Sequence, residues 1–124
     1  MTRDAEAQPL ETVVLVEEES IVLGAKIVVS WHVPHHDGTL RAPRHPSART
    51  EPLERPPGVV FRTRITLALP RGALVTRVED RPSTRTRSTL EHLTGGNRGP
   101  LRRVTRRRYR VGRGGGLEEA PGPA

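Results

Sequence analysis

The stretch "IVLGAKIVVSWHV", residues 21–33, carries the strongest periodic pattern in the chain. Apolar side chains fill its odd-numbered positions, while Lys26, Ser30 and His32 are the polar side chains at even-numbered positions. An alternation of period two with many β-branched residues is typical of a half-buried β-strand. We therefore expect one strand over residues 21–33, and it is the starting point for an all-β interpretation of the chain.

The preceding segment, "TVVLVEEES" at residues 12–20, predicts a second strand. Its acidic end, Glu17–Ser20, is expected to form the turn between the two strands. A helix through residues 10–23 is the alternative, because several apolar side chains there fall near one helical face. Four adjacent apolar residues followed by three glutamates favour the strand.

Three further strands complete the expected fold. The segment "VVFRTRITLALP", residues 59–70, alternates apolar and polar side chains. Pro70-Arg71-Gly72 predicts a tight turn, because proline fixes φ and glycine accepts a positive φ, and residues 73–80 then form the hairpin partner. The arginine-rich segment 101–111 supplies the last strand. Five short antiparallel strands without a clear helix predict a small barrel or sandwich, either OB-like or SH3-like.

Long polar segments separate these strands. Residues 34–58 contain six prolines, three histidines and four arginines, and they are expected to form a long loop that acts as an arm or an insert. Residues 81–100 are a second polar segment, in which 88–93 predict one helical turn. The sequence therefore predicts one β domain over residues 1–111, including the long loop, and a flexible Gly/Pro-rich tail over 112–124.

Composition limits the classes of protein to which the chain can belong. A length of 124 residues with a hydrophobic fraction of 33% suits one small core. The absence of cysteine excludes disulfides, zinc–thiolate sites and a cysteine nucleophile. The first residues, "MTRDAEAQPLE", lack the apolar segment of a signal peptide, and no stretch is long enough for a transmembrane helix. We expect a protein that is not secreted, is cytoplasmic or part of a virion, and has no membrane partner.

Charge is unevenly distributed along the chain. The formal net charge is +7, but residues 1–58 carry a net −3 and residues 59–124 a net +10. Such an asymmetry predicts a polyanionic partner for the second half, either nucleic acid or an acidic protein surface. The alternative is that the arginines are solvated and serve solubility.

The segment "LRRVTRRRYRVGRGGG", residues 101–116, is the centre of this positive charge. Eight arginines and no acidic residue lie between Arg98 and Arg113. Arginine can hold a phosphate with two parallel hydrogen bonds, and Tyr109 could stack on a base. One or two such charges would protect an exposed strand edge, but eight exceed that purpose. The predicted nucleic-acid-binding residues are Arg62, Arg64, Arg98, Arg102, Arg103, Arg106, Arg107, Arg108, Tyr109, Arg110 and Arg113.

A second cluster of polar residues contains most of the histidines. His32, His35, His36, Asp37 and His45 lie within fourteen residues and form a weak candidate site for Zn, Ni or non-haem Fe. The spacing matches no helical metal motif, and Asp37-Gly38 is an ordinary turn pair. An exposed polar loop is therefore the favoured interpretation, and no cofactor is expected.

These observations favour a non-enzymatic function. The chain has no phosphate-binding glycine loop, nucleophile elbow or dinucleotide motif, so no catalytic residues are predicted. The leading hypothesis is a basic β-protein that binds nucleic acid through phosphate contacts. The alternative is a structural subunit of a virion, phage head–tail junction or ribonucleoprotein, as a homo-oligomer or with other chains, whose loop and tail lie across neighbouring subunits. A histidine metal site is the second alternative.

Overall fold

The computed structural model describes residues 8–82 and 102–121, and this part of the chain is all-β. Its long strands follow the period-two segments of the sequence, since alternating apolar side chains can bury one face of a sheet. The elements are β1 (Leu10–Val22), β2 (Ala25–His35), β3 (Gly38–Arg41), β4 (Arg49–Pro52), β5 (Val59–Pro70), β6 (Leu74–Pro82), β7 (Arg102–Val111) and β8 (Leu117–Glu119), with short 3-10 turns η1 (Ala42–Arg44) and η2 (Arg113–Gly115).

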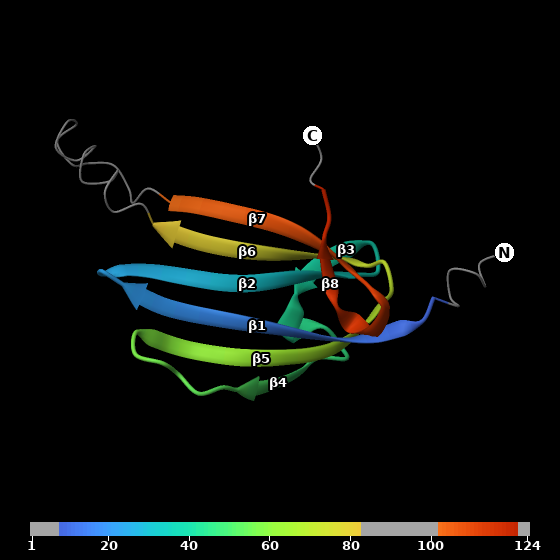
Figure 1. Cartoon of the computed structure of the whole chain (residues 1–124), viewed down its shortest axis with the longest axis horizontal. Helices are drawn as coiled ribbons and strands as arrows, with labels where there is room; N and C mark the ends of the chain where they lie inside the picture. Colours follow the sequence, from blue (N-terminus) through green and yellow to red (C-terminus); the bar gives the residue numbers. More distant parts are fainter. Residues whose placement is uncertain (1–7, 83–101, 122–124) are drawn as a thin grey trace.

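The strands form one curled antiparallel sheet, a half-barrel. Their order is β4-β5-β1-β2-β6-β7-β8, and β3 pairs with β2 outside this path. Figure 1 shows β5, β1, β2, β6 and β7 side by side, while β3 and β8 lie near one end of them. No described segment forms a helix that could span a lipid bilayer.

The curl arises where β1 and β2 separate. They pair from Glu18 opposite Val29 to the hairpin tip, and beyond Glu18 the first half of β1 stays with β5 while β2 pairs with β3 and β6. Glu18 and Val29 are directly opposite each other, so their side chains lie on the same face of the sheet. Side chains alternate along a strand, so Trp31 lies on the face of Val29, whereas Leu15 lies on the face opposite to Glu18. These two core residues therefore start from opposite faces of the paired segment. The right-handed twist of the sheet turns these opposite faces toward each other once the strands have separated.

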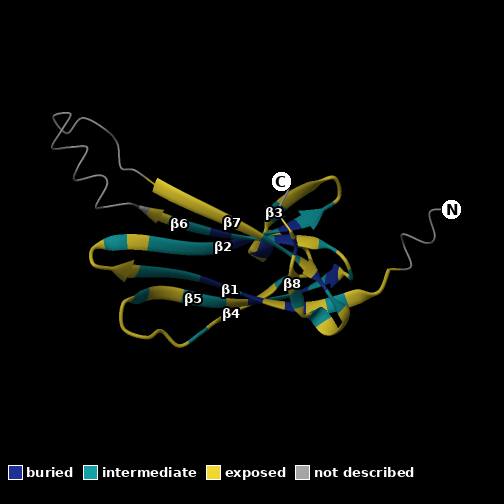
Figure 2. Ribbon diagram, turned by 45° about the horizontal axis from the view of Figure 1, so that its top comes forward, coloured by how far each residue is buried: buried dark blue, intermediate teal, exposed yellow. Residues whose placement is uncertain are grey.

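The core lies between the two facing halves of the sheet. Figure 2 shows the buried residues gathered toward the end of the molecule that holds β3 and β8, and exposed residues at the other end of the strands. The glycine-rich η2 turn approaches β1 so closely that a side chain at Gly115 would overlap the backbone carbonyl of Thr12. The core residues are Val13, Leu15, Trp31, Val33, Ala42, Ile65, Leu67, Leu69, Val75 and Val111.

The expected strand over residues 21–33 is wrong at its beginning. β1 continues through Glu17–Ser20, and the turn falls at Leu23-Gly24, whose φ values are 51° and 78°. Two consecutive residues with positive φ form the tight hairpin turn that matches the twist of the flanking strands, and glycine at the second position favours it. The turn therefore lies inside the apolar run, and β1 carries its three consecutive glutamates within a strand.

The turn after β5 is confirmed, but its expected hairpin is wrong. The Ala73 N–H donates to the Pro70 carbonyl at 3.0 Å. However, β6 pairs with β2 and β7, whereas β5 pairs with β1 and β4. The turn therefore crosses from one half of the sheet to the other. Its backbone joins both halves, because the Arg71 N–H donates to the Pro9 carbonyl and the Gly72 N–H donates to the Val111 carbonyl.

Two segments expected to be irregular contain regular structure. Residues 34–58 include β3, η1 and β4, and Ala42 of this segment is fully buried in the core. Residues 112–121 form η2 and β8, so the flexible tail predicted from residue 112 differs from the structure. These additions raise the strand number above the expected five. Residues 88–93, where one helical turn was expected, lie outside the described residues.

Candidate nucleic-acid interface

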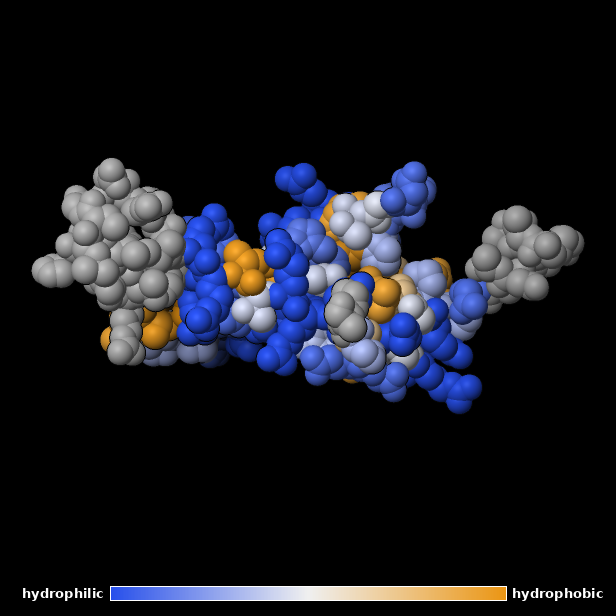
Figure 3. Space-filling view, turned by 90° about the horizontal axis from the view of Figure 1, so that it is seen from above, coloured by the Kyte–Doolittle hydropathy of each residue, from blue (hydrophilic) through white to orange (hydrophobic). Residues whose placement is uncertain are grey.

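The arginine-rich segment forms strand β7, which pairs with β6 over nearly its whole length. Its core-end residues, Tyr109 and Val111, pack in or against the core and fix which side chains point outward. Arg102, Val104, Arg106, Arg108 and Arg110 therefore project from the outer face. Figure 3, seen from the β7 side, shows hydrophilic side chains over much of this surface, with smaller apolar patches between them.

Arg106 and Arg108 occupy the middle of this outer face and lie opposite neutral residues. Their partners across the β6–β7 ladder are Val78 and Thr76, respectively. β8 pairs with β7 only from Tyr109 onward, so β6 is the only strand of the described chain beside Arg106 and Arg108. Their guanidinium groups make no ion pair with any described residue. Arg106 and Arg108 therefore carry positive charge on the outer face that no described residue compensates.

Other arginines of β7 have acidic neighbours. Arg102 makes a two-pronged ion pair with Asp80, in which Nε lies 3.1 Å from Oδ1. The Arg107 guanidinium lies 3.8 Å from a Glu119 carboxylate oxygen, although both side chains are more than half exposed. Acidic neighbours therefore reduce the positive charge of β7 at Arg102, on the outer face, and at Arg107, on the opposite face.

Arg110, Arg103 and Arg113 differ in their surroundings. Arg110 lies opposite Leu74 on one side and Glu118 on the other, without an ion pair in the described structure. Arg103 projects from the face opposite to Arg106, and Arg113 begins η2. Arg98 of the predicted set lies outside the described residues.

Tyr109 does not share the outer face with Arg106 and Arg108. Its ring packs against the core, with its centroid 5.6 Å from that of Trp31 and the planes tilted by 47°. The ring is partly buried by this contact. The predicted base-stacking residue therefore belongs to the core side of β7, and a strand of nucleic acid lying over Arg106 would not reach it.

The two predicted arginines of β5 lie apart from β7. Three strands, β1, β2 and β6, separate β5 from β7 in the sheet. Arg62 lies opposite Glu18, and the Arg64 guanidinium is 3.8 Å from a Glu51 carboxylate oxygen. These arginines have acidic cross-strand neighbours and do not extend the β7 surface.

Two glutamates of β1, Glu11 and Glu17, bind groups of the same chain. Buried Glu17 fills the fork between β1 and β2, where it accepts the Trp31 backbone N–H at 2.8 Å and the Arg41 Nη2 at 2.6 Å. Glu11 accepts Arg71 Nε at 2.8 Å and the Gly114 N–H at 3.0 Å. The hydrogen bond from Arg71 is the main cause that lowers the pKa of Glu11. This attachment is complete above the usual carboxyl pKa and is lost as the pH falls through the lowered value.

The structure brings three of the five predicted metal ligands together. The His35 ring centroid lies 3.9 Å from that of His36 and 5.4 Å from that of His45. His45 Nδ1 accepts the Ser47 backbone N–H at 3.1 Å, and burial, with a smaller electrostatic effect of the neighbouring His35, lowers the pKa of His45. No group of three or more histidine and carboxylate side chains in the described parts of the chain has the geometry to hold a metal ion.

A hollow on the outer face was missed by the sequence analysis, apart from Arg106 itself. His32, Thr39, Thr76, Val78 and Arg106 line it. His32 was considered only as a metal ligand, and the two threonines lie 37 positions apart in the chain. Only the register of four neighbouring strands places these residues together, so no local pattern in the sequence could have indicated them.

No known protein-family model matches the chain, and neither the curated proteins nor the solved structures include a significantly similar one.

Proposed function

We propose that this protein binds single-stranded nucleic acid through its phosphates, along the outer face of β6 and β7. One observation carries the proposal: Arg106 and Arg108 stand at alternate positions of β7, opposite neutral residues and without an ion pair among the described residues. Their positive charge has no use inside the part of the fold that is described, whereas the buried glutamate of β1 has a partner in the same molecule.

The spacing of these arginines suits an extended strand. Alternate side chains of a β-strand stand about 7 Å apart, which is comparable with the spacing of successive phosphates along an extended single strand. Each guanidinium can donate two parallel hydrogen bonds to one phosphate. Among the described residues, no strand pairs with the edge of β7 beside Arg106, whereas the Ala120 N–H donates to the Arg108 carbonyl at 2.8 Å.

The proposed binding is independent of base sequence. Trp31 is buried and Tyr109 packs on the core side, so neither offers a stacking surface beside Arg106. Phosphate contacts then supply the affinity, which falls steeply as the salt concentration rises. Some small antiparallel barrels bind nucleic acid over a strand face, and this analogy of fold class supports the proposal.

The alternative function, a structural subunit of a larger assembly, has less support from the structure than from the sequence. It rested on residues 34–58 and the C-terminal segment as arms without a fold of their own, but both add strands to the sheet. An acidic protein surface remains a competing partner for the same arginines, and the experiment below distinguishes it from nucleic acid.

The test is the fluorescence anisotropy of a labelled twenty-nucleotide oligothymidine, titrated with the full chain at several salt concentrations. We expect binding at low salt and a linear fall of log affinity with log salt concentration. The double variant Arg106→Gln/Arg108→Gln should weaken binding, and the slope should become shallower by about 1.4, since each lost phosphate contact removes roughly 0.7.

The matched control is Arg62→Gln/Arg64→Gln, which removes the same charge from β5. At about 0.1 M salt it should change the affinity less than about twofold, because four strand spacings, about 19 Å along the sheet, separate β5 from β7 and the screening length is then about 10 Å. Equal losses in the two double variants would show that only net charge matters. A wild-type chain that fails to bind at low salt would overturn the proposed function and leave an acidic protein as the partner to examine.

A further inference from the structure

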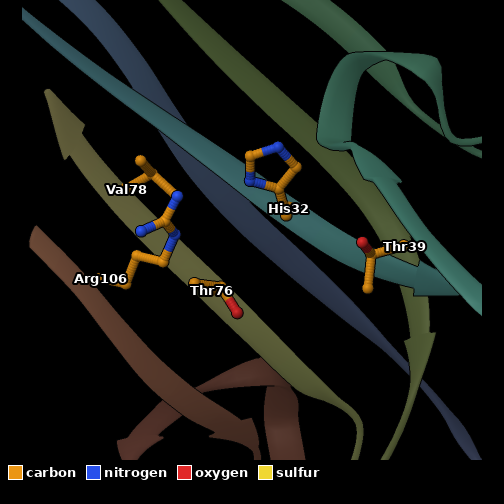
Figure 4. Close-up of a pocket in the computed structure, with 5 residues that line it drawn as sticks. All are labelled: His32, Thr39, Thr76, Val78 and Arg106. Atoms are coloured by element: carbon orange, nitrogen blue, oxygen red, sulfur yellow. The ribbon is translucent and has the colours of Figure 1, made fainter. Parts of the chain in front are cut away.

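The hollow on the outer face joins β2, β3, β6 and β7. It has a volume of about 310 Å³ and is lined by His32, Thr39, Thr76, Val78 and Arg106 (Figure 4). The register explains why these side chains meet. His32 is opposite Thr76, Val78 is opposite Arg106, and Thr39 pairs with Pro34, two residues from His32 on the same face.

The lining of the hollow is rich in hydrogen-bond donors. Arg106 carries a permanently charged guanidinium, Thr39 and Thr76 each carry a hydroxyl, and His32 carries an imidazole N–H. Figure 4 shows the Arg106 side chain extending over β6 on the side where His32 projects. None of the described lining residues is acidic, and Asp80, on the same face, is already paired with Arg102.

This set of groups suits one kind of ligand. A phosphate group accepts hydrogen bonds from several directions and carries negative charge, so a guanidinium with nearby hydroxyls satisfies it. A nucleobase needs flat walls for stacking, and the described lining offers the single ring of His32 and one apolar side chain, Val78, against the charged and hydroxyl groups that suit a phosphate. The space exceeds that of one phosphate and leaves room for an attached sugar.

We infer that this hollow is a phosphate seat: it binds one phosphate of the nucleic-acid strand through Arg106, Thr39 and Thr76, while Arg108 contacts an adjacent phosphate. The inference rests on the proposed function, and it adds that a defined site, rather than a diffuse positive surface, anchors the strand. The hydroxyls of Thr39 and Thr76 distinguish a defined phosphate site from a diffuse positive surface. Binding to a diffuse surface depends on charge and not on neutral side chains.

The experiment removes one hydroxyl without changing charge or shape. Thr76→Val should weaken binding of the labelled oligothymidine roughly fivefold, because the hydrogen bond it donates has a charged acceptor. The slope against salt concentration should stay unchanged, since no charge is lost. The control is Thr105→Val, the same substitution on β7 at a residue that projects from the opposite face; it should leave the affinity unchanged.

A second measurement observes the seat directly in the full chain. Inorganic phosphate should shift the amide resonances of Thr39 and Thr76, and sodium chloride at the same ionic strength should not.

If Thr76→Val and Thr105→Val behave alike while Arg106→Gln/Arg108→Gln weakens binding, the seat is wrong and the proposed function stands. If phosphate shifts those resonances but Thr76→Val leaves oligonucleotide binding intact, the hollow holds free phosphate only and the inference is overturned. If the wild-type chain binds no oligonucleotide, the proposed function itself fails.

Discussion

Strands β1 and β7 carry opposite charges, and they differ in how many of their charged side chains form ion pairs with described residues. β1 contains Glu11, Glu17, Glu18 and Glu19, three of which form ion pairs with Arg71, Arg41 and Lys26. β7 contains six arginines, and two of them form ion pairs with described residues. Among the described residues, the acidic strand is therefore largely compensated, and most arginines of the basic strand are not.

The positions of the two strands in the sheet explain this difference. β1 lies in the interior of the sheet, with β5 along most of its length and β2 beside its second half. β7 has β6 on one side, and β8 covers only its last three residues on the other. A strand near the edge has fewer neighbours to supply counter-charges, so its charge is available to a ligand. Strand position, rather than the number of charged residues, indicates which charges can bind.

The stability of the fold should depend strongly on the buried glutamate of the compensated strand β1. Glu17→Ala should lower the free energy of unfolding by about 3 kcal/mol, because it removes the ion pair of buried Glu17 with half-exposed Arg41 and leaves the Trp31 backbone N–H without its acceptor. Urea denaturation, followed by Trp31 fluorescence, measures it. Glu51→Ala, which removes the exposed pair with Arg64, should cost less than about 0.5 kcal/mol. Similar losses would mean that burial does not distinguish the two pairs.

Oligonucleotide binding should weaken when an arginine of β7 receives an acidic cross-strand neighbour, as the glutamates of β1 have basic partners. Thr76→Glu places a carboxylate opposite Arg108 and should weaken oligothymidine binding roughly tenfold at low salt, through neutralisation of that arginine and repulsion of phosphate. Anisotropy titration measures the change. Thr66→Glu, the same substitution on the outer face of β5, serves as the control, and at about 0.1 M salt it should weaken binding less than about twofold. A larger loss from Thr66→Glu would place the binding surface on the other half of the sheet.

A weak effect is expected at Arg110, near the end of β7 that pairs with β8. Glu118→Gln removes the acid opposite Arg110 and should strengthen oligonucleotide binding about twofold, since exposed charges at this distance interact weakly. Glu51→Gln makes the same change in net charge beside Arg64 and should alter binding less. The same titration at low salt compares them. An equal gain from both variants would contradict a binding surface centred on β7.

Much of the strand content could be predicted from the sequence, because alternation is a local property. Residues 59–70 form β5 with the expected bounds, and residues 102–111 form β7 within one residue of expectation. The hairpin turn was misplaced because the β-branched residues on both sides of Gly24 continue the apolar pattern, while three glutamates resemble a polar turn. The fork that buries Glu17 depends on its contacts with Trp31 and Arg41, which lie 14 and 24 residues away.

The candidate interface was predicted in part for the same reason. The sequence indicated the arginine-rich strand and the alternation of its side chains. It gave no indication that Asp80 pairs with Arg102, that Tyr109 packs on Trp31, or that Thr39 and Thr76 lie beside Arg106. Each of these contacts joins strands that are distant in the chain.

The sequence alone determined that this protein is built from β-strands and that its positive charge is concentrated in the second half. Both properties are carried by composition and by a two-residue period, which short segments express independently of their surroundings. The tertiary structure alone decided which charges are neutralised, where the sheet splits and which face of β7 is open. Those outcomes depend on strand order and register, which are fixed by the burial of side chains from distant segments in one shared core.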